Sequence, residues 1–197
     1  MSRTFFEKPL ERKSGVNPLG LKGFDHIEFW VDSADQWRDF FTTKYGMTPR
    51  AYGDAKTGLR GRRAHVVGQG RVNFVVSEPQ GSGPEADEIR AHLAKHGCGV
   101  RDVAFKVKDA KLAFTEAQRR GANAVRSLHE DKAIAHAAIA AYGDTIHSFV
   151  ERREHGPFMP GFQNVPGGID DRDINFAMID HVVANVERMD EWVTFYE

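Results

Sequence analysis

Two aspartate–histidine pairs are the residues of this sequence best suited to metal chemistry. Asp25-His26 stands near the start of the chain and Asp180-His181 near its end. A neutral imidazole binds iron, zinc or copper, and a nearby carboxylate can complete such a site. From residue type alone, His181 is either a metal ligand or an ordinary strand histidine, and both interpretations stay open.

Two further carboxylates could join the first of these histidines. His26, Asp102 and Glu151 could in principle bind a divalent metal. We favour the alternative that they are a relic of such a site, whose polar side chains hydrogen-bond one another. The other seven histidines and Cys98 show no ligand spacing or catalytic signature.

The two aspartate–histidine pairs belong to an internal repeat. Gly23–Phe41 and Met178–Tyr196 share the pair, a tryptophan and two aromatic positions in one ungapped register, at an offset of 155 residues. A fainter copy, Val100–Ala122, matches the first at an offset of 76 and places Asp102 on His26. The chain therefore holds two units of about 75–80 residues and the start of a third.

Each copy predicts a strand followed by a helix. Ile27, Phe29 and Val31 alternate with more polar neighbours, which is the period of a half-buried strand. Ser33 is expected to begin the helix and Gly46 to end it. The offset of 76 then makes Phe105 equivalent to Phe29 and Val107 equivalent to Val31.

Further short apolar runs after each helix complete a β-α-β-β-β unit. Two units side by side are expected to form an α+β half-barrel, with helices on the convex face and a concave face that we call the cup. His26 alternates with the residues that face the helix, so it should point into the cup. The same alternation would point His181 into a second cup.

Composition limits the classes of function. The 197 residues carry a formal net charge of −1, with 41% hydrophobic and 28% charged residues, which indicates neither a nucleic-acid-binding nor a membrane-surface protein. No apolar run reaches the length of a membrane span, and residues 1–22 read as a polar leader rather than a signal peptide. A single cysteine excludes an intramolecular disulfide, so we expect a cytoplasmic protein.

Five stretches carry a resemblance to a known family. They are NPLGLKGFDHIEFWV, GVRDVAFKVKDA, YGDTIHSFVER, GPFMPGF and the MIDHVVANV segment, which together extend over most of the chain. On these stretches the sequence resembles the 4-hydroxyphenylpyruvate dioxygenase family of the vicinal oxygen chelate superfamily. The resemblance implies a leader (1–22), a non-catalytic N-terminal domain (23–163), a linker (164–175) and the start of the catalytic domain (176–197).

The resemblance also implies an activity. Members of the family use Fe(II), held by two histidines and a glutamate, to convert 4-hydroxyphenylpyruvate and O₂ into homogentisate and CO₂ in tyrosine catabolism. His181 would be the first iron ligand, and the other two would lie beyond Glu197. We therefore expect the whole family protein to be an Fe(II)-dependent dioxygenase and a homo-oligomer. We expect no cofactor-binding residue in this chain besides the iron ligand, and the 197-residue chain should be inactive alone.

Two other functions remain open at this stage. Hydroxymandelate synthase shares the fold and the substrate but hydroxylates the side chain. A non-catalytic vicinal-oxygen-chelate module could instead serve assembly or small-molecule binding.

Overall fold

The computed structural model describes residues 17–153, 155–166 and 176–197. Most of the expected leader and linker lies outside this range, so the expected division into domains stays a prediction. The described elements are, in chain order, β1 (Leu21–Trp30), α1 (Ala34–Tyr45), β2 (Thr48–Gly53), β3 (Arg62–Gln69), β4 (Val72–Pro79), α2 (Pro84–His96), β5 (Gly99–Val107), α3 (Ala110–Arg119), β6 (Ala124–Glu130), β7 (Ile134–Ala140), β8 (Ile146–Arg152), β9 (Gln163–Asn164) and α4 (Met189–Tyr196).

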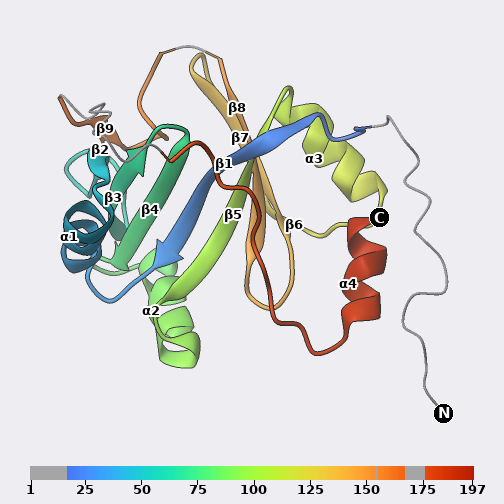
Figure 1. Cartoon of the computed structure of the whole chain (residues 1–197), viewed down its shortest axis with the longest axis horizontal. Coiled ribbons are helices and arrows are strands. Elements are labelled where there is room, and N and C mark those ends of the chain that lie inside the picture. The colour runs from blue at the N-terminus through green and yellow to red at the C-terminus, as the bar shows by residue number, and fades with distance from the viewer. Residues whose placement is uncertain (1–16, 154, 167–175) are drawn as a thin grey trace.

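The strands form one mixed sheet in the order β6-β7-β8-β5-β1-β4-β3-β2-β9 (Figure 1). Two β-α-β-β-β units meet at its centre, where β1 and β5 are antiparallel, and each unit pairs its first and last strands in parallel. In these parallel pairs Phe29 lies opposite Val76 and Phe105 lies opposite Phe149. The register thus keeps the equivalence of Phe29 and Phe105, and the expected fold class is confirmed.

The first helix of each unit begins as the sequence predicts. The Ser33 hydroxyl accepts from the backbone N–H of Gln36 at 3.4 Å, and the Asp109 carboxylate accepts from that of Leu112 at 2.8 Å. Such caps satisfy backbone donors that a helix leaves unpaired. Gly46 ends α1 with a φ of 64°, a conformation that glycine adopts without strain.

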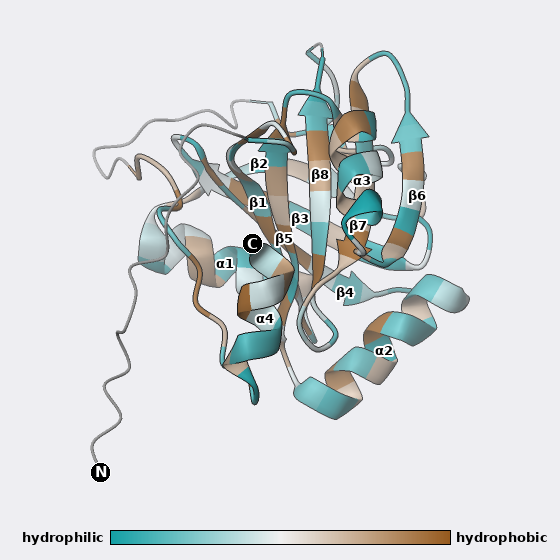
Figure 2. Ribbon diagram, turned by 90° about the vertical axis from the view of Figure 1, so that its right-hand side faces the viewer, coloured by the Kyte–Doolittle hydropathy of each residue, from teal (hydrophilic) through white to brown (hydrophobic). Residues whose placement is uncertain are grey.

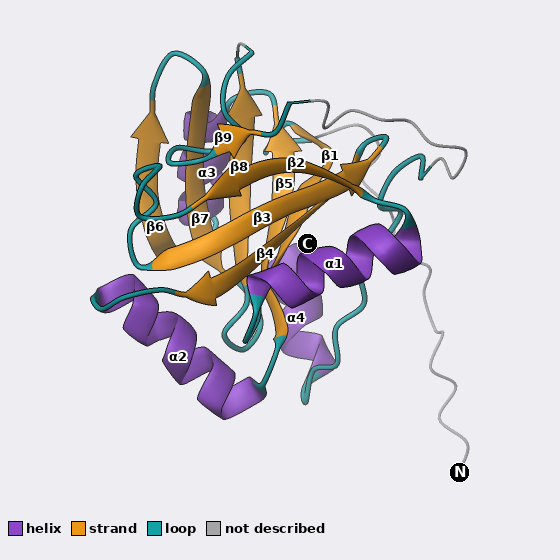
Figure 3. Ribbon diagram, turned by 90° about the vertical axis from the view of Figure 1, so that its left-hand side faces the viewer, coloured by secondary structure: helices purple, strands orange, loops and turns teal. Residues whose placement is uncertain are grey.

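On the convex face, α1 and α3 lie mainly over the strands on either side of the two central ones. Helix α1 packs on β3 and β4, as Figure 3 shows, and α3 packs on β7 and β8. The central strands β1 and β5 are crossed instead by residues 176–188, which lead into α4 (Figure 1). Helices α3 and α4 lie on the same side of the sheet (Figure 2).

The third copy of the repeat forms its helix but not its strand. No strand is assigned between Phe176 and the start of α4, although the repeat predicts one around His181. A strand needs the free edge of another strand, and this segment lies on side chains in the middle of a sheet face. Phe176 and Ile179 pack on the core beside α1, and Phe195 packs on the core beside α3. The aromatic side chains of α4 therefore lie on the first two units.

The cup is filled by the chain itself. Phe158 and Phe162 pack on the cup face of the first unit, among Val66 and Val75. Met159 contacts this cluster and also the smaller one in the second unit. Residues 158–162 thus join the two units from the concave side. Among the described residues, none of the helices has the length and apolar character needed to cross a membrane.

Candidate functional site

The first aspartate–histidine pair is buried at the floor of the cup. A shift in the register between Phe24 and His26 marks a β-bulge in β1, and both Asp25 and His26 are buried. His26 Nδ1 lies 2.8 Å from Asp25 Oδ1. The ring of Phe158 packs edge-on against the imidazole, with 5.3 Å between the two ring centroids. Phe158 therefore covers His26 from the side of the cup's opening.

Arg152 completes the surroundings of this pair. Its guanidinium donates to both oxygens of Asp25, at 2.7 and 2.9 Å, and also to the carbonyl oxygen of Phe158. Burial alone would raise the pKa of Asp25, but the hydrogen bonds and charges of His26 and Arg152 outweigh it and hold that pKa well below its usual range. Asp25 is therefore an ionised carboxylate that receives donors on both oxygens.

Two more carboxylic acids face each other beside His26. Glu28 and Asp102 are direct partners across the antiparallel β1–β5 pair, and their exposed fractions are only 3% and 1%. The Ser77 hydroxyl donates to Glu28 at 2.7 Å, and Arg62 forms an ion pair with the same oxygen. Ser148 donates to Asp102 through its backbone N–H, at 3.0 Å, and through its hydroxyl.

The pKa values of these two acids are shifted in opposite directions. Burial raises the pKa of Asp102, and the charges of His26 and Arg126 only partly oppose it. For Glu28 burial acts in the same direction, but the charges of Arg62 and Arg126 outweigh it and lower the pKa. The cup can therefore hold one carboxylate and one neutral acid side by side, as expected where like charges share a buried site.

Glu151 does not belong to this cluster, and its inclusion with His26 and Asp102 was wrong. Its Oε2 accepts from the backbone N–H of Ala110 at 3.0 Å, at the start of α3, and its Oε1 accepts from Arg153. Successive residues of a strand face opposite sides, so Arg152 faces the cup and Glu151 faces the helix. Glu78 makes the same contact with the start of α1, which identifies Glu151 as part of the repeated helix cap.

The acid that does share the cup with His26 and Asp102 is Glu28. The sequence contained a signal for it, because Glu28 follows His26 by two residues and a strand places such residues on one face. Within the described residues, no three histidine, cysteine, aspartate or glutamate side chains come close enough together to hold a metal ion. The polar side chains of the cup are instead paired with one another and with arginines.

His181 lies in a contrasting environment. Its Nδ1 is 2.8 Å from Asp180 Oδ2, the same separation as in the Asp25–His26 pair, but its side chain is 74% exposed. A carboxylate on Nδ1 favours the tautomer whose Nε2 lone pair is available, which is the usual arrangement behind a metal-bound histidine. The structure thus places His181 away from the cup, with one nitrogen accessible to an external ligand.

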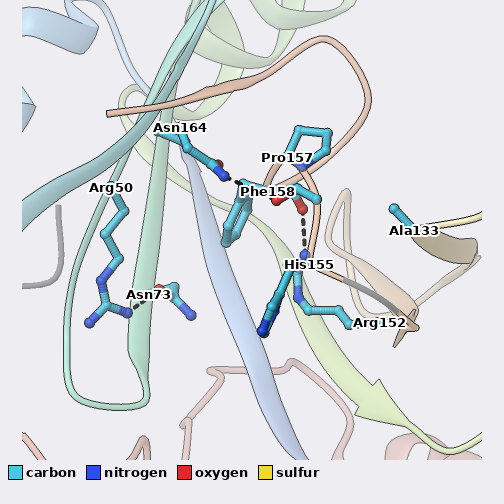
Figure 4. A pocket seen from close by; sticks show the side chains of 10 residues that line it. Arg50, Asn73, Ala133, Arg152, His155, Pro157, Phe158 and Asn164 are labelled. Carbon is cyan, nitrogen blue, oxygen red and sulfur yellow. Dashed lines mark hydrogen bonds between the residues drawn. The ribbon is translucent and has the colours of Figure 1, made fainter. Parts of the chain in front are cut away.

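A cavity of about 630 Å³ opens at one end of the cup (Figure 4). Its wall includes Arg50, Asn73, Arg152 and Phe158, together with residues 155–157. Arg50 donates to Asn73 Oδ1 at 2.6 Å, and Arg152 is already bound to Asp25 and to the Phe158 carbonyl. Phe158 lines this cavity, whereas His26, Glu28 and Asp102 do not.

Comparisons with known proteins agree with this architecture. The chain is 38% identical over 192 residues to the 4-hydroxyphenylpyruvate dioxygenase of Yarrowia lipolytica, an alignment that covers 89% of this chain and 48% of that protein. It is 35% identical over 213 residues to the enzyme of the same name from Aspergillus fumigatus, covering 96% of this chain and 52% of that protein. The chain thus spans about half the length of the curated relatives it matches.

Solved structures show the same fold at lower sequence identity. A mutant of 4-hydroxymandelate synthase from Streptomyces coelicolor superposes with a TM-score of 0.67 at 21% identity, over 78% of this chain and 45% of that one. Methylmalonyl-CoA epimerase from Mycobacterium tuberculosis superposes with a TM-score of 0.58 at 19% identity, over 73% of this chain and 95% of that one. A family model described as "Hydroxyphenylpyruvate dioxygenase, HPPD, N-terminal" matches residues 16–175. This chain therefore belongs to the family of hydroxyphenylpyruvate dioxygenase N-terminal domains.

Proposed function

We propose that this chain is the N-terminal part of a 4-hydroxyphenylpyruvate dioxygenase, which converts 4-hydroxyphenylpyruvate and O₂ into homogentisate and CO₂. The observation that carries the proposal is the identity of 38% and 35% to two dioxygenases of that name, over 89% and 96% of this chain. The 4-hydroxymandelate synthase likeness, at 21% identity, speaks for the shared fold alone. Hydroxymandelate synthesis therefore remains the less favoured alternative.

The first two units would then act as a scaffold. Their cup is occupied by Phe158, Met159 and Phe162, and its acids are paired with serines and arginines. A substrate would have to displace this packing to reach His26. We therefore assign the cup a role in stability, and the aromatic substrate would bind elsewhere in the whole protein.

His181 would contribute to the metal centre. A non-haem iron site of this type needs two histidines and one carboxylate on one side of the metal, and bound iron would supply the activation of O₂. The histidine of the third repeat copy, His181, has an exposed imidazole that is backed by the neighbouring carboxylate of Asp180. These residues fit one position of such a site and not a complete one, so no step of the reaction is assigned to them.

The test is a chimera in which residues 1–197 replace the matching half of the Yarrowia lipolytica relative. Circular dichroism and iron content establish folding and loading, and chromatography of the products follows. We expect homogentisate from the chimera, loss of iron and product with His181→Ala, and no effect of His129→Ala, which changes an exposed histidine on β6. Formation of 4-hydroxymandelate would favour the synthase, and full activity of a folded His181→Ala chimera would exclude the ligand assignment.

The 197-residue chain alone provides the complementary measurement. We expect weak Fe(II) binding and no homogentisate, because a single imidazole cannot hold iron against water. Titration curves of the wild type, His26→Ala and His181→Ala should then be alike. Tight binding of one Fe(II) that is lost in His26→Ala would mean that the cup is a true metal site.

A further inference from the structure

A second cavity, distinct from the cup, lies on the convex face beneath α4. Its volume is about 540 Å³, within the range of about 300–1,000 Å³ typical of small-molecule sites. Helix α3, strands β5, β7 and β8, the residues that precede and begin β1, and α4 all contribute to its wall. The wall is largely apolar and includes Leu21, Phe105, Ala117, Ile139, Phe149 and Phe195.

One polar group with a defined hydrogen-bonding role lies in this apolar wall. His147 is buried, and its Nδ1 is 3.0 Å from the carbonyl oxygen of Val103. A carbonyl only accepts hydrogen bonds, so Nδ1 carries the proton and Nε2 is the acceptor. The Tyr196 hydroxyl, 2.6 Å from Nε2, must then donate to it.

In this arrangement the oxygen of Tyr196 can accept a hydrogen bond from a ligand. A tyrosine oxygen that donates its hydrogen can still accept a hydrogen bond. In the described part of the chain, no other side chain or backbone donor is bonded to the oxygen of Tyr196. The ionisable residues Arg120 and Glu197 also border the cavity, but both are exposed. A ligand held among the apolar side chains should therefore be uncharged, because a buried charge without a partner is strongly unfavourable.

We propose that this cavity binds a small neutral molecule with an apolar body and one hydroxyl group, of the phenol or alcohol class, whose hydroxyl donates to Tyr196. The site is separate from the cup and does not depend on iron or on the proposed dioxygenase activity. Because Phe195 and Tyr196 belong to α4, the ligand would also stabilise the docked position of that helix.

The test uses 4-propylphenol as the probe and propylbenzene as its hydroxyl-free counterpart, in calorimetric titrations of the 197-residue chain. We expect saturable binding of one molecule of 4-propylphenol, about threefold to tenfold tighter than propylbenzene, the difference that one hydrogen bond makes. Tyr196→Phe should remove this preference without weakening propylbenzene, whereas the control Tyr45→Phe, at an exposed tyrosine of α1, should leave it intact.

A filled cavity should exclude both probes. Ala117→Leu adds volume inside the cavity and should lower both affinities by at least about tenfold. The control Gln118→Leu introduces the same side chain on the exposed side of the same helix and should lower neither. Amide chemical-shift mapping of the wild type removes any dependence on the folding of the variants, and the shifts should centre on residues that line this cavity. The proposal is overturned by absence of saturable binding, by shifts centred elsewhere, by unchanged affinity in folded Ala117→Leu, or by a hydroxyl preference that survives Tyr196→Phe.

Discussion

Replacing the two facing acids of the cup by their amides should have very different effects on stability. Glu28→Gln removes the negative partner of Arg62, whose side chain is only 11% exposed. Removing one member of a buried ion pair costs about 3–5 kcal/mol in general. Glu85 lies 3.2 Å from Arg62 and remains as a second partner, so we expect a loss of about 2–3 kcal/mol in the free energy of unfolding.

Asp102→Asn should change the same free energy by no more than about 1 kcal/mol at pH 7. Burial raises the pKa of Asp102, so the folded protein favours the neutral acid more than the unfolded chain does, and asparagine imitates that neutral form. The backbone N–H of Ser148 can still donate to the amide oxygen, and the Ser148 hydroxyl can rotate to accept from the amide nitrogen. The substitution also removes a potential like charge opposite Glu28.

The pH dependence of stability gives a second distinction. The folded pKa of Asp102 lies above its unfolded value of 3.8, so its contribution is fully present below that pH and is lost as the pH rises through the folded pKa. Glu28 has the opposite sign, because its pKa is lowered from 4.5, and its contribution is lost as the pH falls through the folded pKa. Asp102→Asn should reduce the loss of stability at rising pH, and Glu28→Gln should reduce the loss of stability at falling pH.

Urea unfolding of the 197-residue chain at a series of pH values measures both effects, provided that the dependence of free energy on urea concentration is unchanged. Asp87→Asn, at a side chain that is 69% exposed, is the control and should lie within about 0.5 kcal/mol of the wild type. If Asp102→Asn is as destabilising as Glu28→Gln at pH 7, Asp102 is an ionised and paired group, and our account of the cup is wrong.

Two further changes test other parts of the structure. Burial and the charges of His129 and Arg126 lower the pKa of His136 to about 4. Between about pH 6.5 and pH 4 the unfolded chain therefore binds a proton at this histidine and the folded protein does not, which lowers stability. His136→Gln should remove the loss of stability between these pH values, and an unchanged acid limb in urea unfolding would contradict the assignment. Gly70→Ala should release residues 176–188 from the sheet, because Gly70 has a φ of 54° and an added Cβ would overlap with the carbonyl oxygen of Phe176. Faster tryptic cleavage after Arg188 than in the wild type is the expected result, and equal rates would mean that this contact does not hold the segment.

The repeated local features could be predicted from the sequence because each depends on residues close together in the chain. Ser33 and Asp109 cap their helices, and the offset of 76 correctly aligns Phe29 with Phe105. The direction of His26 follows from alternation along one strand. Each of these predictions depends on one local feature. That feature is the two-residue period of a strand, the first turn of a helix or the register between two copies of the repeat.

Features that depend on distant partners could not be predicted in the same way. Glu151 lies near the end of β8, and its face depends on where that strand begins in relation to β5, which the sequence of β8 alone does not reveal. Arg152, its neighbour, reaches Asp25 across 127 residues of sequence. The missing strand around His181 has a similar cause, because a period-two pattern forms a strand only where another strand offers its edge.

The two aspartate–histidine pairs show how one local motif can serve two purposes. In both pairs a carboxylate oxygen lies 2.8 Å from Nδ1, so the motif itself orients the imidazole and selects its tautomer. The surroundings then decide what the other nitrogen can reach. Around His26, Phe158 covers the ring and Arg152 donates hydrogen bonds to Asp25, so the pair is part of the buried core. Among the described residues no counterpart of Phe158 or Arg152 contacts His181, and its imidazole is 74% exposed. This accessibility is what an iron ligand needs, and it is why we propose His181 rather than His26 as the metal ligand.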